Sequence, residues 1–442
     1  MAAAKIAPRL PKGMRDFLPD EMLKREYVFD RVRETFHLYG FEPLQTPVME
    51  LRETLLGKYG EDAEKLIYFA QHAGGKEELS LRYDLTVPLA RVVAQYENQI
   101  TLPFKRYQLS PVWRGDRPQR GRYREFYQCD ADIVGIGDMS ADAEVIGVVV
   151  TALRRLGFPK FTVKINNRKL LIAIGHYSGV PDAQLPDLYR SVDKFDKIGA
   201  DGVRAELEQR GIAHEAVVRM MDLLQLNSGS GLERLAALAK LLGGDQEGLA
   251  ELRQVAEHLA NAAVPPQFYE FDFTMVRGLS YYTGPIFETF ITEPNLGAVS
   301  GGGRYDGLIG LFRRESLPTT GISLGIERII DLMDELNLYP NGIGGTVVQV
   351  LVTVFNGDTR AEATRLAAEL RAAGVHTELY MQDKNVGKQM AYADKKRIPL
   401  VAVLGGDEIA AGVVKFKRLS DGVEVSVERG VAAAKIRELL AD

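Results

Sequence analysis

The sequence predicts an α+β domain with a mixed, mainly antiparallel sheet and a helical insertion, followed by a small α/β domain. Three observations support this fold class. Residues 79–135 alternate between polar and apolar side chains, as strands do, and residues 168–262 are rich in Leu, Ala, Arg and Glu. After residue 346, apolar strands alternate with amphipathic helices. A chain of 442 residues has room for two or three domains.

The first domain is predicted to begin with a helix and to continue mainly in strands. Apolar residues from Met22 to Leu38 follow helical spacing, and Gly40 ends that helix. Pro43 and Pro47 then interrupt a short extended segment. The next elements are strands over 79–88, 104–116 and 122–135, and a helix over 141–157.

Composition divides the rest of the chain. Residues 1–167 and 263–336 are expected to form the core of the first domain, and 168–262 its helical insertion. Residues 337–345, NLYPNGIGG, have the composition of a linker, and 346–442 form the second domain. Further elements are predicted as strands over 268–278, 281–291, 347–355, 376–381 and 399–405, helices over 327–336, 359–374 and 385–397, a hairpin turning at Asp421-Gly422, and a last helix.

Several classes of protein are excluded by composition. The single cysteine, Cys129, excludes an internal disulfide and a zinc site built from cysteines. No stretch reaches the roughly 18 apolar residues of a membrane span, and the start lacks the apolar core of a secretory signal. A formal charge of -5 argues against nonspecific coating of nucleic acid, but RNA could still bind a local basic surface. We expect a cytoplasmic protein with no membrane partner.

The six histidines carry no sign of a metal or nucleophile site. They are scattered without ligand spacing, at positions 37, 72, 176, 214, 258 and 376, and we expect them to be structural or surface residues. No GxSxG motif is present, and Cys129 has no histidine near it in sequence. Covalent nucleophilic catalysis therefore has no support, and no metal ligands are identified.

Alternation along the predicted hairpin separates an apolar face from a polar one. In the first strand Arg106, Gln108, Ser110 and Arg114 share a face; in the second, Arg122, Arg124, Phe126, Gln128, Asp130 and Asp132 do. A solvated polar face is the ordinary interpretation. An aromatic ring gains no stability from exposure to water, so Phe126 favours a second interpretation. In it, the ring stacks on a planar base and Arg114 holds a phosphate.

Two more polar sets lie in predicted strands. Arg82, Asp84 and Thr86 share a strand face that ends at Pro88, and an acid beside a hydroxyl suits an ammonium group, although ordinary surface is an equal alternative. Further on, Phe271, Phe273 and Met275 form an inward stripe that Arg277-Gly278 interrupts. Tyr281 and Tyr282 should point to opposite faces, so that at most one of them lines a given pocket.

The glycine-rich segments match no phosphate-binding fingerprint. GGGRYDG fits neither GxxxxGK[ST] nor a strand–GxGxxG–helix unit, so tight turns at Gly301 to Gly303 are expected. In GISLGIERII a strand of small residues runs into a helix with Arg328 in its first turn. An anion could bind there, between the helix N-terminus and the guanidinium, or Arg328 could simply be a surface arginine.

Together these segments resemble the three signature motifs of class II aminoacyl-tRNA synthetases. The helix before Gly40 with the strand ending at Pro47 is similar to motif 1, Tyr107 to Asp132 to motif 2, and GISLGIER to motif 3. RGLSYYTGPIFE and SGGGRYDGLIG are similar to segments of histidyl-tRNA synthetases. The resemblance runs from about Lys12 to the C-terminus, and LRYDLTVPLAR, GRYREFYQCD and SVDKFDKIG are most similar to the branch that includes the eukaryotic enzymes.

The resemblance implies a ligase for histidine and its tRNA that uses ATP as co-substrate with Mg²⁺, works as a homodimer through the motif 1 region, and reads the anticodon with residues from about 346. It implies catalytic roles for Arg114 and Arg277, on either side of the α-phosphate. The resemblance implies that histidine binds to Asp84, Leu85, Thr86, Gln128, Asp132, Arg277, Tyr281 and Tyr282. It implies that ATP binds to Arg114, Arg122, Phe126, Gln128 and Arg328, and that the acceptor end of the tRNA contacts Arg117, Gln119 and Arg120.

Three positions depart from common members of that family, and three alternatives remain. Many members have Asp where this chain has Ser280, and bacterial members often have Glu in place of Asp84 and Asp132. The alternatives are a non-catalytic relative like the regulatory subunit of ATP phosphoribosyltransferase, a tRNA sensor, and a synthetase for another amino acid. Intact Arg114, Arg277 and Arg328, together with RGLSYY, favour the histidine enzyme.

Overall fold

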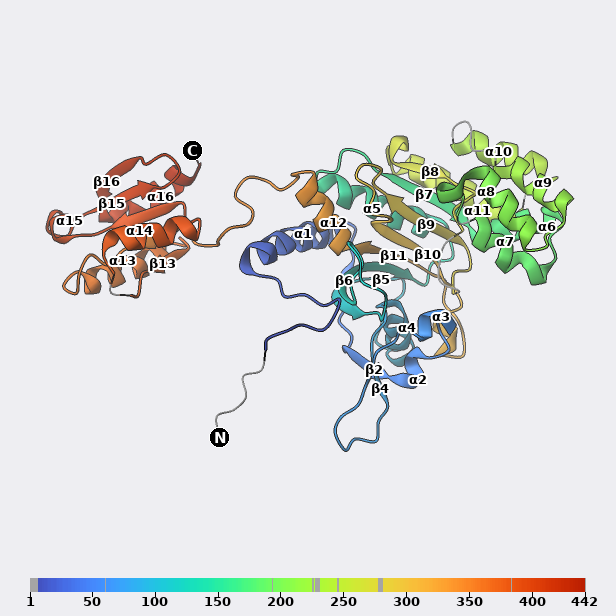
Figure 1. Cartoon of the computed structure of the whole chain (residues 1–442), viewed down its shortest axis with the longest axis horizontal. Coiled ribbons are helices and arrows are strands. Elements are labelled where there is room, and N and C mark those ends of the chain that lie inside the picture. Colours follow the sequence, from blue (N-terminus) through green and yellow to red (C-terminus); the bar gives the residue numbers. More distant parts are fainter. Residues whose placement is uncertain are drawn as a thin grey trace. The chain divides into compact units, whose positions relative to one another are not determined.

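The apolar residues of the chain are buried in two separate compact units. A computed structural model describes residues 7–59, 61–192, 194–224, 226, 231–244, 246–276, 281–382 and 384–441 (Figure 1). The first unit comprises Met1–Arg15 and Val28–Tyr339, and the second Asp16–Tyr27 and Pro340–Asp442. Each unit has its own sheet.

An eight-stranded sheet forms the centre of the first unit. Its strands lie in the order β1 (Glu42–Pro43), β5 (Phe104–Trp113), β6 (Glu125–Val134), β11 (Thr319–Gly325), β10 (Ser300–Arg304), β9 (Pro285–Phe290), β7 (Thr162–Asn167) and β8 (Tyr269–Phe271). The pairs β1–β5 and β7–β8 at the two edges are parallel, and every other pair is antiparallel. The predicted mixed, mainly antiparallel sheet is confirmed.

The apolar face of the β5–β6 hairpin packs on α1 (Pro19–Leu38). The ring of Phe36 lies 5.4 Å from that of Tyr107, and the ring of Phe29 lies 5.0 Å from that of Tyr127, centroid to centroid. Farther along the sheet, α5 (Ser140–Arg155) covers β11, and α11 (Glu247–Asn261) packs on α5. Because apolar side chains fill this side, the polar side chains of β6 must face the other way.

The predicted strand over 79–88 is wrong beyond Leu81. β4 (Leu79–Leu81) pairs with β2 (Met49–Leu51) and β3 (Phe69–Ala70) in a small sheet, and α4 (Thr86–Gln95) begins at Thr86. Asp84 Oδ1 accepts a hydrogen bond of 3.2 Å from the backbone N of Val87, which satisfies one N–H of the first turn. Pro88 is tolerated in that turn because its missing N–H would have had no partner in the helix.

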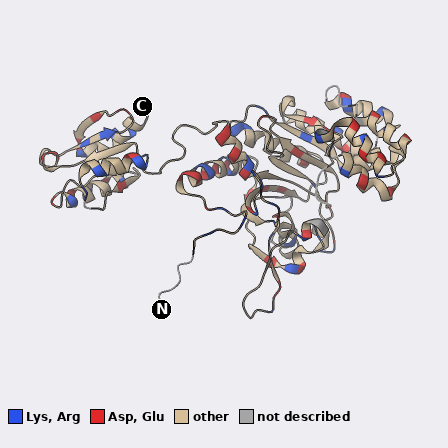
Figure 2. Ribbon diagram, viewed as in Figure 1, with Lys and Arg blue, Asp and Glu red and all other residues tan. Residues whose placement is uncertain are grey.

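The insertion is helical. It comprises α6 (Arg168–Ser178), α7 (Leu185–Val192), α8 (Phe195–Gln209), α9 (His214–Leu224), α10 (Gly231–Leu241) and α11. Gly199, with φ of 69°, interrupts α8. Basic and acidic residues are interspersed along these helices and α1 (Figure 2). Among the described residues, no helix has both the length and the apolar character needed to cross a membrane.

The second unit has helices on both faces of a five-stranded sheet. The strand order is β13 (Thr377–Leu379), β12 (Val350–Val352), β14 (Leu400–Val403), β15 (Val413–Arg418) and β16 (Glu424–Glu428). Side chains alternate between two cores, so Val350 and Val352 pack with α13 (Arg360–Ala372) and α16 (Ala432–Ala441), and Leu351 packs with α14 (Val386–Lys395). The sequence does not indicate the short helix α15 (Gly406–Ala411).

Tight turns at Gly301 to Gly303 were also a wrong expectation. These glycines form most of β10, and Gly302 lies opposite Ile322 of β11. A Cβ atom at Gly302 would lie 2.2 Å from the carbonyl oxygen of Gly321 and 2.8 Å from the ring of Phe287. Glycine is therefore needed here for close packing between strands.

We expect Gly302→Ala to lower the free energy of unfolding by about 1–3 kcal/mol or more, because backbone and ring atoms must move to admit a methyl group. Urea denaturation followed by circular dichroism measures this. Gly307→Ala is the matched control, since a Cβ there would meet nothing within 4 Å. Equal stability of the two variants would contradict the packing argument.

Candidate active site

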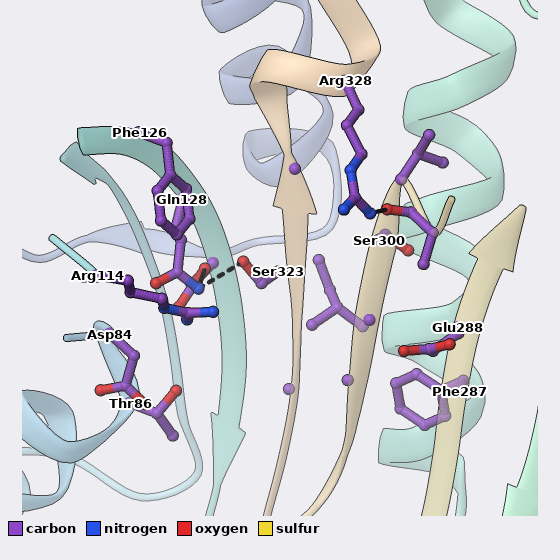
Figure 3. A pocket seen from close by; sticks show the side chains of 18 of the residues that line it. Asp84, Thr86, Arg114, Phe126, Gln128, Phe287, Glu288, Ser300, Ser323 and Arg328 are labelled. Carbon is purple, nitrogen blue, oxygen red and sulfur yellow. Dashed lines mark hydrogen bonds between the residues drawn. The ribbon is translucent and has the colours of Figure 1, made fainter. Parts of the chain in front are cut away.

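A cavity of about 470 Å³ lies over the polar face of β6, β10 and β11. Its other walls come from the residues before α4, the start of β9, the loop between β5 and β6, and the N-terminus of α12 (Ile326–Glu335). Figure 3 shows Arg114, Phe126, Gln128 and Asp84 gathered on one side and Glu288, Ser300 and Arg328 on the other. Each side of the pocket therefore carries both a carboxylate and an arginine.

Most of the predicted site residues line this pocket. They are Asp84, Thr86, Arg114, Arg122, Phe126, Gln128, Asp132, Tyr281, Tyr282 and Arg328. Leu85 is instead fully buried beside it, and its carbonyl oxygen accepts a hydrogen bond of 3.3 Å from Arg106. Arg117, Gln119 and Arg120 lie on the exposed loop between β5 and β6. Arg277 and Ser280 lie outside the described residues.

Both Tyr281 and Tyr282 line the cavity, so the expectation that only one of them could do so was wrong. The two rings lie 5.0 Å apart, centroid to centroid. Strand alternation does not apply to this pair because β9 begins only at Pro285. Burial is the main cause that raises the pKa of each tyrosine above its ordinary value.

Asp84 is held by the elements on which it sits. Its Oδ1 accepts hydrogen bonds from the hydroxyl of Tyr59, at 2.8 Å, and from the backbone N of Val87. Its Oδ2 is buried and has no hydrogen-bond partner among the described residues. Burial raises the pKa of the Asp84 carboxyl, although both hydrogen bonds oppose that shift. One carboxylate oxygen thus remains available for a donor from a ligand.

Asp132 is paired on both of its oxygens. A guanidinium nitrogen of Arg106, which is 0% exposed, lies 2.7 Å from Asp132 Oδ2. The hydroxyl of Tyr305 donates a hydrogen bond to Asp132 Oδ1. A Cβ at Gly321 would lie 1.9 Å from that same oxygen, so the position of the carboxylate depends on the glycine in β11. Burial raises the pKa of Asp132, and Arg106 acts against this.

Asp130 also lines the pocket and is 2% exposed. It makes no ion pair within the described part of the chain; its contacts there include the amide of Gln128, at 3.5 Å, and a hydrogen bond with the side chain of Ser323. Burial raises the pKa of Asp130 to about 7; Arg106 lowers it and Asp132 raises it. Asp130 is therefore a buried carboxylate that forms no ion pair with a described residue, although Arg106 and Arg82 act on it from a greater distance.

Arg114 lies between two aromatic rings, on the same side of the pocket as Asp84. Its guanidinium carbon is 4.4 Å from the ring centroid of Tyr83 and 5.1 Å from that of Phe126. Its Nε donates a hydrogen bond of 3.1 Å to the carbonyl of Tyr83, which fixes the side chain. No carboxylate among the described residues pairs with Arg114, so its terminal nitrogens suit an anion in the pocket.

Arg328 bridges two walls of the pocket from the first turn of α12. Its Nε donates to the carbonyl oxygen of Gly121 at 3.1 Å, and one of its terminal nitrogens donates to the carbonyl of Ala298. It therefore ties the loop between β5 and β6 to the segment before β10. The side chain lies on the side of the pocket where Figure 3 places Ser300.

Three site residues had no role assigned from the sequence. Asp130 was visible as a member of the polar face of its strand, and alternation could have nominated it. Arg106 shares a polar strand face with Arg114, but nothing local indicates that it is fully buried. Tyr305 follows a glycine strand and meets Asp132 across 173 residues, so no local signal could have found it.

The large mixed sheet with its pocket, in one chain with a separate α/β unit, defines the fold of a class II aminoacyl-tRNA synthetase. The family profile "Histidyl-tRNA synthetase" matches residues 13–329, and "Anticodon binding domain" matches residues 349–439. The chain belongs to the histidyl-tRNA synthetase family, and it is an enzyme of the aminoacyl-tRNA synthetase class.

Similar proteins match over nearly the whole chain. Histidine–tRNA ligase from Bacteroides fragilis (strain YCH46) is 41% identical, covering 94% of this chain and 96% of the relative. The enzyme of the same name from Aeropyrum pernix is 41% identical over 98% of each chain. The crystal structure of histidyl-tRNA synthetase from Nostoc sp. PCC 7120 matches with a TM-score of 0.87 at 31% identity, over 98% of this chain and 100% of that one.

We expect Asp130→Asn to stabilise the ligand-free protein at pH 8. An acid whose folded pKa is raised contributes stability that is present below its unfolded pKa and lost as pH rises through the folded pKa, here about 7. Asparagine cannot ionise, so the variant escapes this loss. Melting temperatures should favour the variant, by on the order of 2 °C, at pH 8 and less at pH 5.

The control is Asp201→Asn, which makes the same change on an exposed part of α8. Its melting temperature should stay close to that of the wild type at both pH values. A destabilised Asp130→Asn at pH 8 would contradict the assignment of an unpaired buried charge.

Proposed function

We propose that this chain attaches histidine to its tRNA in two steps at the pocket described above. In the first, the carboxylate of histidine attacks the α-phosphate of ATP, which forms histidyl-adenylate and releases pyrophosphate. In the second, the terminal ribose hydroxyl of the tRNA attacks the acyl carbon and releases AMP. The observation that supports this most is the joining, in one cavity, of a buried carboxylate cluster and an arginine held between two rings.

The buried carboxylates of the pocket, Asp84 and Asp132, suit the amino acid. Asp84, with one unpartnered oxygen, would hold the α-ammonium group together with Thr86 and Gln128. Asp132 and Tyr282 would read the imidazole ring, with Tyr281 as a further wall. The side chain of Leu85 lies in the core, so its part would be limited to supporting this segment.

Phe126 and the arginines that line the pocket suit ATP. Phe126 would stack on the adenine, Arg114 would hold the α-phosphate, and Arg122 and Arg328 would contact the remaining phosphates. Arg277 would act across the α-phosphate from Arg114, as the family resemblance implies. Negative charge that grows on the phosphoryl oxygens would be stabilised by these guanidinium groups, and no covalent intermediate with the protein is needed.

Mg²⁺ is proposed to enter with ATP. This ion prefers one or two carboxylates plus phosphate oxygens to a cage made only of protein. In the described residues, no group of three or more His, Cys, Asp or Glu could hold a metal ion. Glu288 and Glu327 line the pocket, and each would supply a carboxylate oxygen, although Glu327 is already ion-paired with Arg15. The bound ion would neutralise phosphate charge.

The tRNA would contact two parts of the chain. Arg117, Gln119 and Arg120 lie on an exposed loop at the pocket, where they would meet the acceptor end. The second unit would read the anticodon, since residues 349–439 match an anticodon-binding domain. In this scheme 1–167 and 263–336 form the catalytic core, 168–262 the insertion, 337–345 the linker and 346–442 the anticodon-binding domain, in a protein of the cytoplasm.

Pyrophosphate exchange is the direct test. The purified chain should incorporate labelled pyrophosphate into ATP when histidine is added, and should not do so with any of the other amino acids. Exchange with a different amino acid would point to another synthetase. A folded protein without exchange for any amino acid would favour the regulatory-subunit or sensor alternative.

We expect Arg114→Ala to lower kcat for histidine-dependent exchange by about 10²–10³, because a donor to the developing phosphoryl charge is removed. The KM for histidine should change little, since Asp84 and Asp132 are intact. Arg204→Ala, at an exposed position on α8, is the control for loss of a positive charge. Wild-type rates from Arg114→Ala would sink the proposed role, and Arg277→Ala should behave like it.

A homodimer is proposed through the motif 1 region. The small sheet that follows this region exposes an apolar face, on which Met49 is 48% and Leu51 is 43% exposed. Their strand partners Leu81 and Leu79 are half-buried on the same face. An apolar sheet face that the monomer leaves in water is typical of an interface between subunits.

We expect the double variant Met49→Lys/Leu51→Lys to sediment as a monomer, while the wild type sediments as a dimer. Two charges in an apolar interface would have to be desolvated without partners. Leu232→Lys is the control, since Leu232 is 60% exposed but lies in the insertion. A dimeric double variant, or a monomeric wild type, would place the interface elsewhere or remove it.

A further inference from the structure

Within the described residues, two of the three buried carboxylates of the pocket, Asp84 and Asp130, form no ion pair, although Arg114 acts on Asp84 and Arg82 on Asp130 from a greater distance. Three buried carboxylates, Asp84, Asp130 and Asp132, lie close enough to influence one another's ionisation. Arg106 is the cation that forms an ion pair with one of them. Burying an unpaired charge is costly, so a pocket of this composition favours a cationic ligand.

The demands on these carboxylates differ. Asp132 has Arg106 on one oxygen and the hydroxyl of Tyr305 on the other. Asp84 sits before α4, where its unpartnered oxygen suits the α-ammonium group. Among the described residues, the hydrogen-bonding contacts of Asp130 are the weak one with Gln128 and the one with Ser323, which are neutral groups. It is the member of the cluster whose charge most needs a partner from the ligand.

The register of β6 sets the distance between Asp130 and Asp132. They are separated by one residue, so both point to the pocket and their positions along the strand lie about 7 Å apart. That spacing admits a five-membered ring with a hydrogen bond of about 2.8 Å towards each carboxylate. Gly302 and Gly321 keep the adjoining floor free of side chains, and Tyr282 forms a wall.

We propose that Asp130 is a specificity-determining residue of the histidine site. Its carboxylate accepts a hydrogen bond from one imidazole nitrogen while Asp132 accepts one from the other, so the ring binds with protons on both nitrogens and Tyr282 reads the ring by contact with its face. The cationic ring supplies the ion-pair partner that Asp130 lacks among the described residues. This inference rests on the proposed function and adds to it the protonation state in which the amino acid is selected.

The groups that face Asp130 are consistent with this arrangement. They are Arg106 from β5, Asp132 from β6, Asp84 from the segment before α4, Ser323 from β11, Tyr282, and the buried Arg82, whose hydrogen bonds go to the backbone carbonyls of Thr46, Pro47 and Pro111. Arg106 already pairs with Asp132. Without a ligand, burial raises the pKa of Asp130 to about 7, and the neighbouring carboxylates Asp132 and Asp84 also favour its protonated form. A cationic ring would remove that need.

The test compares histidine with 1,2,4-triazole-3-alanine, whose ring has a similar shape but stays uncharged at neutral pH. Pyrophosphate exchange is measured with wild type, Asp130→Asn and the Asp201→Asn control at pH 7.5. In Asp130→Asn the KM for histidine should rise about tenfold or more, the value for loss of a charged hydrogen bond. The KM for the triazole should change much less, and kcat and the KM for ATP should stay within about threefold.

A purely structural role for Asp130 predicts something else. It would shift both amino acids equally and lower the melting temperature, and either result overturns the proposal, as does an unchanged KM for histidine. Asp130→Ala repeats the comparison should Asp130→Asn fold poorly. Nitrogen-15 spectra of ring-labelled histidine on the wild type should show two protonated nitrogens, and a neutral tautomer would contradict the proposal. Absence of wild-type exchange with histidine would instead remove the proposed function.

Discussion

The first unit depends on one interaction, the buried ion pair between Arg106 of β5 and Asp132 of β6. The two residues lie opposite each other in the antiparallel register, and neither is open to solvent. A buried pair regains its desolvation cost only when its geometry is good. A slip of one residue would bring Arg106 opposite Ala131 or Ile133 and move charge into the apolar layer under α1. The pair therefore specifies the register of the hairpin that carries most of the pocket.

That register also decides what the pocket can bind. Because Gln128, Asp130 and Asp132 share a face, the buried side of β6 presents two carboxylates, and among the described residues Arg106 forms an ion pair with Asp132 but not with Asp130. A protein selected only for stability would not keep a buried carboxylate at Asp130, since a neutral side chain there would cost less free energy to bury. A carboxylate without an ion-pair partner is explained if a cationic ligand completes the cluster. Stability and function often conflict in this way at a binding site.

Local patterns in the sequence predicted the parts of this unit that depend on local rules. Alternation placed Phe126, Gln128 and Asp132 on one face, and the structure finds all three at the pocket. Local patterns failed at two places. Asp84 accepts a hydrogen bond from the first turn of α4, so the segment up to Pro88 is not a strand. Gly302 lies in a strand because it packs against the backbone of its neighbour, and it forms no turn. The contact between Tyr305 and Asp132 follows from strand order, which no short window contains.

Strand order also explains how a long helical insertion can interrupt the chain without disturbing the pocket. The insertion leaves after β7 and returns at β8, and these two strands are parallel neighbours at one edge of the sheet (Figure 1). The pocket lies over β6, β11 and β10, nearer the middle of the sheet. After β8 the chain reaches Tyr281 and Tyr282 and is then fixed by hydrogen bonds between Thr283 and Arg304, whose buried guanidinium pairs with Asp142 of α5. The tyrosines are thus held from the core of the unit, and the insertion can change its surface without moving them.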